Sequence, residues 1–189
     1  MILPLWGDRE GYNMDFEKKV LSKELLALLY ESEKTLGTAE SCTSGMIATA
    51  ITLVPGASNY FKGGIVSYAD EVKIDVLGVD ADVIAEKTAV CEDVVVQMVK
   101  GAIKTLGVDY AVAATGFAGP GSADGIPVGT IWLACGNSDE QVTLQLTEDE
   151  GRDKNVDNAV DKALALLLDF IRQHEPARVG DEVVELTAE

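Results

Sequence analysis

Four short segments of the chain contain residue types that could perform chemistry. Each combines hydroxyl, acidic or basic side chains with at least one glycine, close to the border between an expected strand and an expected helix or loop. They are TAESCTSG (38–45), GGIVSYADEVK (63–73), ATGFAGPGSADGIPVGT (114–130) and EDEGRDKN (148–155). Such residue types suit nucleophilic attack, proton transfer and anion binding.

The first segment is expected to turn from a strand into a helix, with Ser41 at the carboxyl end of the strand. Open α/β sheets bind their ligands at that edge. Backbone N–H groups between Ser41 and Gly45 would suit a phosphate or an oxyanion. Capping of the next helix by Thr43 or Ser44 explains the same residues, so the local pattern leaves both interpretations open.

The second segment offers a base for such a serine, which is a weak nucleophile until a base accepts its proton. The chain has one histidine, His174, at the end of an expected C-terminal helix, and this argues against Ser-His-Asp catalysis. A desolvated lysine can replace histidine, because burial favours the neutral amine. Lys73 follows Tyr68 by about one helical turn. An exposed helix cation explains Lys73 equally well, since nearby acidic residues favour its charged form.

The third and fourth segments suit ligand binding. The glycines at 116, 119 and 121 form neither the GxGxxG dinucleotide fingerprint nor a P-loop, so this segment either wraps a ligand or only turns the chain. Arg152 opens the last expected helix, where a cation is unfavourable to the helix dipole. It either grips an anion or is solvated.

Hydrophobic periodicity predicts the elements that must position these segments. Helices are expected at 15–34, 44–54, 69–78, 80–86, 92–106 and 153–172, and strands at 35–39, 63–69, 109–115, 129–136 and 141–147. This alternation predicts an α/β fold, a three-layer α/β/α sandwich with a mixed, mostly parallel sheet. We expect one domain over 15–174, a loose arm over 1–14 and a polar tail over 175–189.

Composition narrows the function classes. The formal net charge is −17, so nucleic acid is not expected as a partner. No apolar run approaches the roughly 20 residues that a membrane span needs, and the first residues lack the features of a signal peptide. The chain has three cysteines, Cys42, Cys91 and Cys135, which lie far apart in the sequence. An odd number without a CxxC pair is typical of reduced thiols. We therefore expect a cytoplasmic protein without a membrane partner.

Together with PGASNYF (55–61), the four motifs resemble the CinA C-terminal family in order and spacing, across roughly residues 15–172. That family includes stand-alone nicotinamide-nucleotide amidases. The resemblance implies an amidohydrolase that converts the small-molecule substrate nicotinamide mononucleotide to nicotinate mononucleotide and ammonia, for pyridine nucleotide salvage. It implies no metal and no other cofactor, and a homodimer is expected.

The resemblance also implies roles for residues of this chain. Ser41 would be the nucleophile and Lys73 the general base, with Tyr68 as a third catalytic group that relays a proton or orients the lysine. The expected substrate-binding residues are Thr43, Ser44, Gly45, Thr115, Gly116 and Arg152. Backbone N–H groups near Ser41 to Gly45 would stabilise the oxyanion.

The chain departs from the family pattern at Ser44, Cys91, Ile126 and Val156. Ser44 stands where the family usually has glycine, and Val156 lies near the place of an expected second arginine. The main alternative is therefore a catalytically silent protein that binds or senses a pyridine nucleotide. A competence or DNA-repair accessory is a third class, which the acidity of the chain disfavours.

Overall fold

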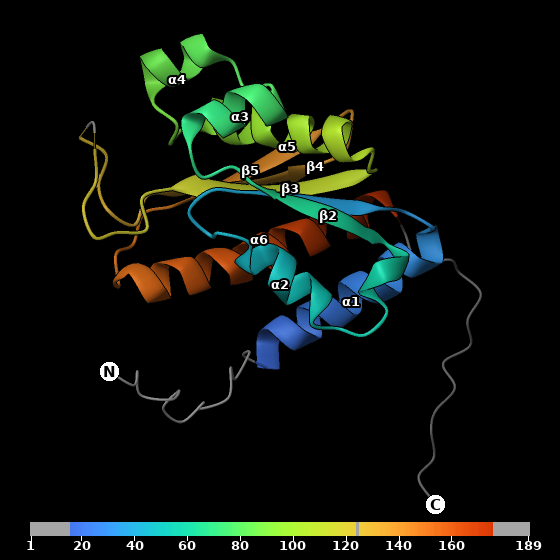
Figure 1. Ribbon diagram of the computed structural model, residues 1–189. Helices are drawn as coiled ribbons and strands as arrows, with labels where there is room; N and C mark the ends of the chain where they lie inside the picture. The colour runs from blue at the N-terminus through green and yellow to red at the C-terminus, as the bar shows by residue number, and fades with distance from the viewer. Residues whose placement is uncertain (1–15, 124, 176–189) are drawn as a thin grey trace, which may run out of the picture.

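The structure, a computed structural model, describes residues 16–123 and 125–175 (Figure 1). Its elements are α1 (Phe16–Ser32), β1 (Leu36–Glu40), α2 (Met46–Thr52), the 3-10 helix η1 (Ala57–Asn59), β2 (Phe61–Val66), α3 (Asp70–Leu77), α4 (Ala81–Lys87), α5 (Glu92–Leu106), β3 (Tyr110–Gly116), β4 (Ile131–Gly136), β5 (Gln141–Leu146) and α6 (Arg152–His174). The expected arm over 1–14 and nearly all of the expected tail lie outside the described residues.

The five strands form one sheet in the order β2-β1-β3-β4-β5. β1 lies between β2 and β3 and runs parallel to both, whereas β4 is antiparallel to β3 and β5 is antiparallel to β4. β3 is buried along nearly its whole length and is rich in alanine, because helices cover both of its faces. The predicted mixed sheet is confirmed.

Helices cover the sheet on both faces, as Figure 1 shows: α3, α4 and α5 lie on one side, and α1, α2 and α6 on the other. Each layer has its own apolar core against the sheet. The chain leaves β1 through α2 on one face, and it leaves β2 through α3 to α5 on the other. The carboxyl end of β1 is therefore a topological switch point, the place where open α/β sheets form ligand sites.

Two helices on one face approach each other through a glycine. Gly101 in α5 packs on the end of α3, and a Cβ atom built at Gly101 would stand 2.0 Å from the Leu77 carbonyl oxygen. No side chain fits there unless backbone moves. Since α3 also carries Lys73, the α3–α5 contact sets the height of that lysine above the sheet.

Two predicted boundaries differ from the structure. α2 begins at Met46 and not at residue 44, and neither Thr43 nor Ser44 caps it, because the residue before the helix is Gly45 and makes no side-chain cap. β2 ends at Val66, so Tyr68 stands beyond the strand and does not close it. In the described part of the chain, no helix is both long and apolar enough to cross a membrane.

Candidate active site

The carboxyl ends of the three parallel strands meet at one edge of the sheet. The Ser41 N–H donates to the carbonyl of Ala114 at 2.9 Å, which ties β1 to β3. The Ser67 N–H donates to the carbonyl of Glu40 at 2.8 Å, which ties β2 to β1. The chain positions just after β1, β2 and β3 therefore lie side by side, and these positions hold three of the four chemical segments.

Ser41 begins a tight turn between β1 and α2, and only 8% of its surface is exposed. Ser44 and Gly45 complete the turn in the left-handed region, with φ of 52° and 91°. A non-glycine residue there costs roughly 1 kcal/mol. Glycine adopts this conformation at no steric cost, and Ser44 adopts it nevertheless.

Glu40, which the sequence analysis treated only as the end of a strand, holds this turn. Its side chain is buried, and its carboxylate accepts four hydrogen bonds. The donors are Thr43 Oγ1 (2.8 Å) and the backbone N–H groups of Gly45 (2.9 Å), Ile47 (3.0 Å) and Ala48 (2.9 Å). The Gly45 N–H is thus already engaged and is not free to bind an oxyanion.

Lys73 is 1% exposed, which excludes the interpretation of an exposed helix cation. Its Nζ donates to the Tyr68 carbonyl at 3.3 Å and to Asp70 Oδ1 at 3.2 Å. No hydrogen bond joins Lys73 to Ser41 within the described residues. In this arrangement the Lys73 amine forms an ion pair with Asp70 and is not directed to the Ser41 hydroxyl.

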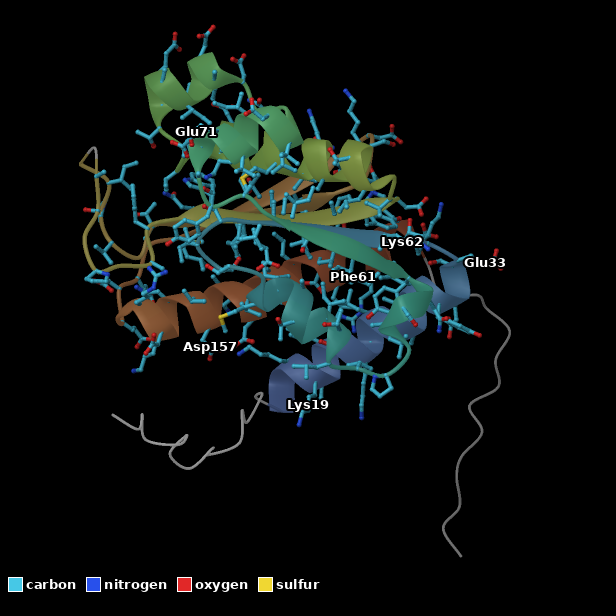
Figure 2. The ribbon with its side chains drawn as sticks, in the orientation of Figure 1. Lys19, Glu33, Phe61, Lys62, Glu71 and Asp157 are labelled. Carbon is cyan, nitrogen blue, oxygen red and sulfur yellow. The ribbon has the colours of Figure 1, made fainter. Side chains whose placement is uncertain are left out.

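Arg152, at the start of α6, contacts the glycine-rich segment after β3 and Tyr68 after β2. Its Nη1 donates to the Gly119 carbonyl at 2.7 Å, and its Nη2 donates to the Tyr68 hydroxyl at 3.4 Å. The Tyr68 ring is exposed. Figure 2 shows how the flanking helices bracket this edge of the sheet, with Glu71 marking α3 on one face and Asp157 marking α6 on the other.

Thr115 and Gly116 lie at the same edge, but their contacts are within the protein. The Thr115 hydroxyl is buried and donates to the Ala89 carbonyl at 2.8 Å, in the connection from α4 to α5. A Cβ atom at Gly116 would stand 2.6 Å from backbone atoms of Ile131 and Thr130. Both residues thus have a packing role in this structure.

A pocket of about 420 Å³ opens between the turn that follows β1 and the start of α6. Its lining residues are Cys42, Thr43, Ser44, Met46, Arg152, Asp153 and Val156. Ligand sites commonly have volumes of about 300–1,000 Å³. Val156 gives the pocket an apolar wall near the position where the family resemblance led us to expect a second arginine.

In residues 16–123 and 125–175, no group of three His, Cys, Asp or Glu side chains could hold a metal ion.

Asn155 is a site residue that the sequence analysis missed. Its Nδ2 donates to the Ala118 carbonyl at 3.0 Å and to Asp149 Oδ1 at 2.9 Å, and its Oδ1 accepts from the Glu150 N–H at 2.9 Å. It thereby fastens the glycine-rich segment to the start of α6, where Arg152 lies. The available signal in the sequence was an asparagine directly before Val156, the first apolar residue of the last expected helix.

Cys42 follows Ser41 directly, but its thiol is a poor rival nucleophile. Burial raises its pKa to about 12. Arg152 and Lys73 are close enough for their charges to oppose that rise, and Glu40 adds to it. Cys135 is buried as well, whereas Cys91 is partly exposed, and all three thiols are free.

Alkylation of the folded protein at pH 8 with iodoacetamide is expected to modify Cys91 first. A thiol with a pKa near 12 is ionised to about one part in ten thousand at that pH, and only the thiolate reacts. Peptide mass spectrometry after short exposure checks this order, with urea-unfolded protein as the control in which all three cysteines react alike. Rapid labelling of Cys42 in the folded protein would contradict the burial and would make Cys42 a second candidate nucleophile.

The fold and site define an α/β protein with a serine turn and a buried lysine at the switch point of a mixed sheet. Residues 18–171 match the family model of the CinA C-terminal domain. The chain belongs to the CinA C-terminal domain family.

Individual relatives agree with this assignment. A CinA-like protein of Akkermansia muciniphila is 42% identical over 158 residues, which cover 82% of this chain and 38% of that protein. A CinA-like protein of Leptospira borgpetersenii serovar Hardjo-bovis is 44% identical over 125 residues, covering 65% of this chain and 29% of that protein. The match thus spans roughly a third of the length of these relatives.

Solved structures match over nearly their whole length. The competence/damage inducible protein CihA from Agrobacterium tumefaciens has a TM-score of 0.80 at 31% identity, covering 82% of this chain and 96% of that chain. A CinA superfamily protein from Enterobacter cloacae has a TM-score of 0.79 at 29% identity, covering 89% and 98%.

Proposed function

We propose that this protein hydrolyses the carboxamide of nicotinamide mononucleotide to nicotinate mononucleotide and ammonia. The observation that carries the proposal is the buried Lys73 amine, held by α3 beside the strand ends from which Ser41 emerges. A buried amine next to a serine turn, in a chain whose one histidine is at the far end of α6, is suited to Ser-Lys acyl transfer.

The reaction begins when Lys73, deprotonated and released from Asp70, accepts the proton of the Ser41 hydroxyl. The Ser41 oxygen then forms a bond to the carboxamide carbon, and the carbonyl oxygen becomes an oxyanion. Lys73 returns the proton to the leaving nitrogen, and the C–N bond breaks to give ammonia and an ester on Ser41. Water, activated by the same amine, hydrolyses the ester and restores the serine.

Substrate binding is assigned to the pocket beside the nucleophile turn. Arg152 is the cation in its lining and provides the guanidinium that would contact the phosphate. Asp153 in the same lining opposes a phosphate, so the group has to approach from the Arg152 side. Tyr68 contacts the Arg152 guanidinium and thereby orients it.

One observation favours a second function, a silent protein that binds the nucleotide without hydrolysing it. The Lys73 amine donates to Asp70 and to a carbonyl and makes no hydrogen bond with Ser41. A lysine that stays charged in this ion pair would accept no proton. Binding without turnover is the result that would separate this function from the amidase.

The test is ammonia release from nicotinamide mononucleotide by the native protein and by Ser41→Ala. We expect turnover in the native protein and a loss of at least about 10³-fold in the variant, because removal of a catalytic nucleophile abolishes the covalent route. Ser138→Ala, in the exposed β4–β5 hairpin, is the matched serine control and should keep native activity. Undiminished turnover by Ser41→Ala would refute the mechanism, and calorimetric binding without ammonia would support the silent protein.

A further inference from the structure

Glu40 is a buried carboxylate that no cation neutralises among the described residues. No ion pair of that part of the chain includes it, although it is only 1% exposed. Burial of a charge is costly unless hydrogen bonds replace its hydration. Here the two carboxylate oxygens accept all four hydrogen bonds, and neither oxygen faces an acceptor. A side chain with two acceptor oxygens is therefore required at position 40, directly before Ser41.

The four hydrogen bonds join the residue before Ser41 to residues that follow it in the turn and in α2. Glu40 precedes Ser41, and its side chain reaches forward to Thr43 and Gly45 and then to the first turn of α2. The backbone of Glu40 is fixed by the Ser67 N–H, and that of Ser41 by its bond to Ala114. The turn is thus held from its strand side and its helix side at once, which limits the positions that Ser41 Oγ can take.

The same bonds determine which backbone donors remain for a ligand. The N–H groups from 41 to 48 that are already engaged are those of Ser41, Ser44, Gly45, Met46, Ile47 and Ala48. Among the described residues, neither Glu40 nor a backbone carbonyl accepts from the N–H groups of Cys42 and Thr43, and the Cys42 N–H has only its own thiol as an acceptor. Two consecutive N–H groups directly after a nucleophile are suited to an oxyanion.

We infer that Glu40 is a positioning residue of the proposed amidase: it fixes the turn so that Ser41 and the N–H groups of Cys42 and Thr43 face one carbonyl group. By occupying the start of α2, Glu40 also excludes an anion there, so the substrate phosphate is bound at the Arg152 side of the pocket. The inference rests on the proposed function for its reaction, but the geometry of the turn can be tested separately.

The first test is Glu40→Gln in the full chain, which keeps the shape of the side chain. The amide nitrogen of glutamine must face at least one N–H donor, so the turn loses a bond and gains a repulsion. We expect kcat for ammonia release to fall about 100-fold, comparable to the loss of an oxyanion donor. KM should change less than about threefold, because the phosphate contact at Arg152 is unaffected.

Two further variants distinguish positioning from a general loss of stability. Ser22→Ala removes a buried hydrogen bond to the Ala50 carbonyl at the other end of α2 and should leave kcat unchanged. Thr43→Val removes one of the four bonds to Glu40 with little change of shape, and it should lower kcat several-fold even if Glu40→Gln does not fold. Equal losses of kcat in Glu40→Gln and Ser22→Ala, or no loss in Glu40→Gln and Thr43→Val, would overturn the inference.

The second test needs no amide substrate. Phenylmethylsulfonyl fluoride sulfonylates an activated serine with release of fluoride, and intact mass spectrometry measures the rate at Ser41. We expect slower labelling in Glu40→Gln and Thr43→Val than in the native protein and Ser22→Ala. This result without ammonia release would sustain the positioning role and reject the proposed substrate. Equal labelling rates in all variants would reject the positioning role, and a native Ser41 that is neither labelled nor active would reject both.

Discussion

Lys73→Met is expected to lower kcat for ammonia release by about 10³-fold or more, because general-base assistance and activation of the nucleophile are both lost. Methionine has a similar length and is apolar, so it suits a side chain that is 1% exposed. The partner carboxylate of Asp70 is half exposed and stays hydrated without the lysine, and folding should therefore persist. Steady-state kinetics together with thermal melting checks both parts.

The matched control is Lys62→Met at the start of β2, where the lysine is exposed and lies at the opposite end of the strand from the site (Figure 2). It should keep native kinetics. Nucleotide binding by Lys73→Met should remain measurable by calorimetry, since Arg152 is retained. If Lys73→Met keeps more than about a tenth of native kcat, then Lys73 is not the base, because a general base contributes at least about 10²-fold.

Gly101→Ala is expected to destabilise the protein by about 2–3 kcal/mol, in the upper range for overpacking of a core. The added Cβ would meet backbone atoms of Leu77 at 2.0–2.8 Å, so α3 or α5 must shift. Alanine normally favours a helix over glycine by about 1 kcal/mol, so the sign of this effect is opposite to that of helix propensity. Urea unfolding followed by circular dichroism measures it.

The same substitution should also reduce turnover. α3 carries Lys73, and the clash with Leu77 at the end of α3 moves the helix away from its position over the sheet. We expect kcat to fall while the nucleotide still binds beside α6. Lys100→Ala, at the exposed neighbouring position in α5, also introduces alanine but without a clash, and it should alter stability by less than about 0.5 kcal/mol. A stability gain in Gly101→Ala would show that the two helices separate freely.

Elements with strong periodicity could be predicted closely from the sequence. α5 (Glu92–Leu106) and α6 (Arg152–His174) have apolar stripes that one face of a helix must bury, and their bounds differ little from the predicted ranges. β3 could be recognised as a buried strand from its small apolar residues. Ser41, Tyr68 and Arg152 were predicted as site residues from motifs whose order along the chain resembles the family, and the structure places Tyr68 and Arg152 in contact.

Predictions failed where the partner of a group is distant or unusual. The start of α2 was misplaced because its N–H groups are satisfied by Glu40, which lies before the turn, and not by the hydroxyl of a neighbouring residue. Asn155 was missed because its three bonds reach two separate loops. For Thr115, contact with substrate stays a prediction, and its hydroxyl donates to the Ala89 carbonyl in this structure.

The sequence by itself determined the α/β class, most elements and the residue types available for chemistry, since periodicity and composition are properties of the chain alone. Only the tertiary structure decided which of these residues lie at the same edge of the sheet. The segments of Ser41 and Lys73 come to that edge through the parallel pairing of β1 with β2 and the crossover of the chain between the two faces of the sheet. The burial of Lys73 also depends on the packing of the chain, because desolvation is set by neighbours that are distant in sequence.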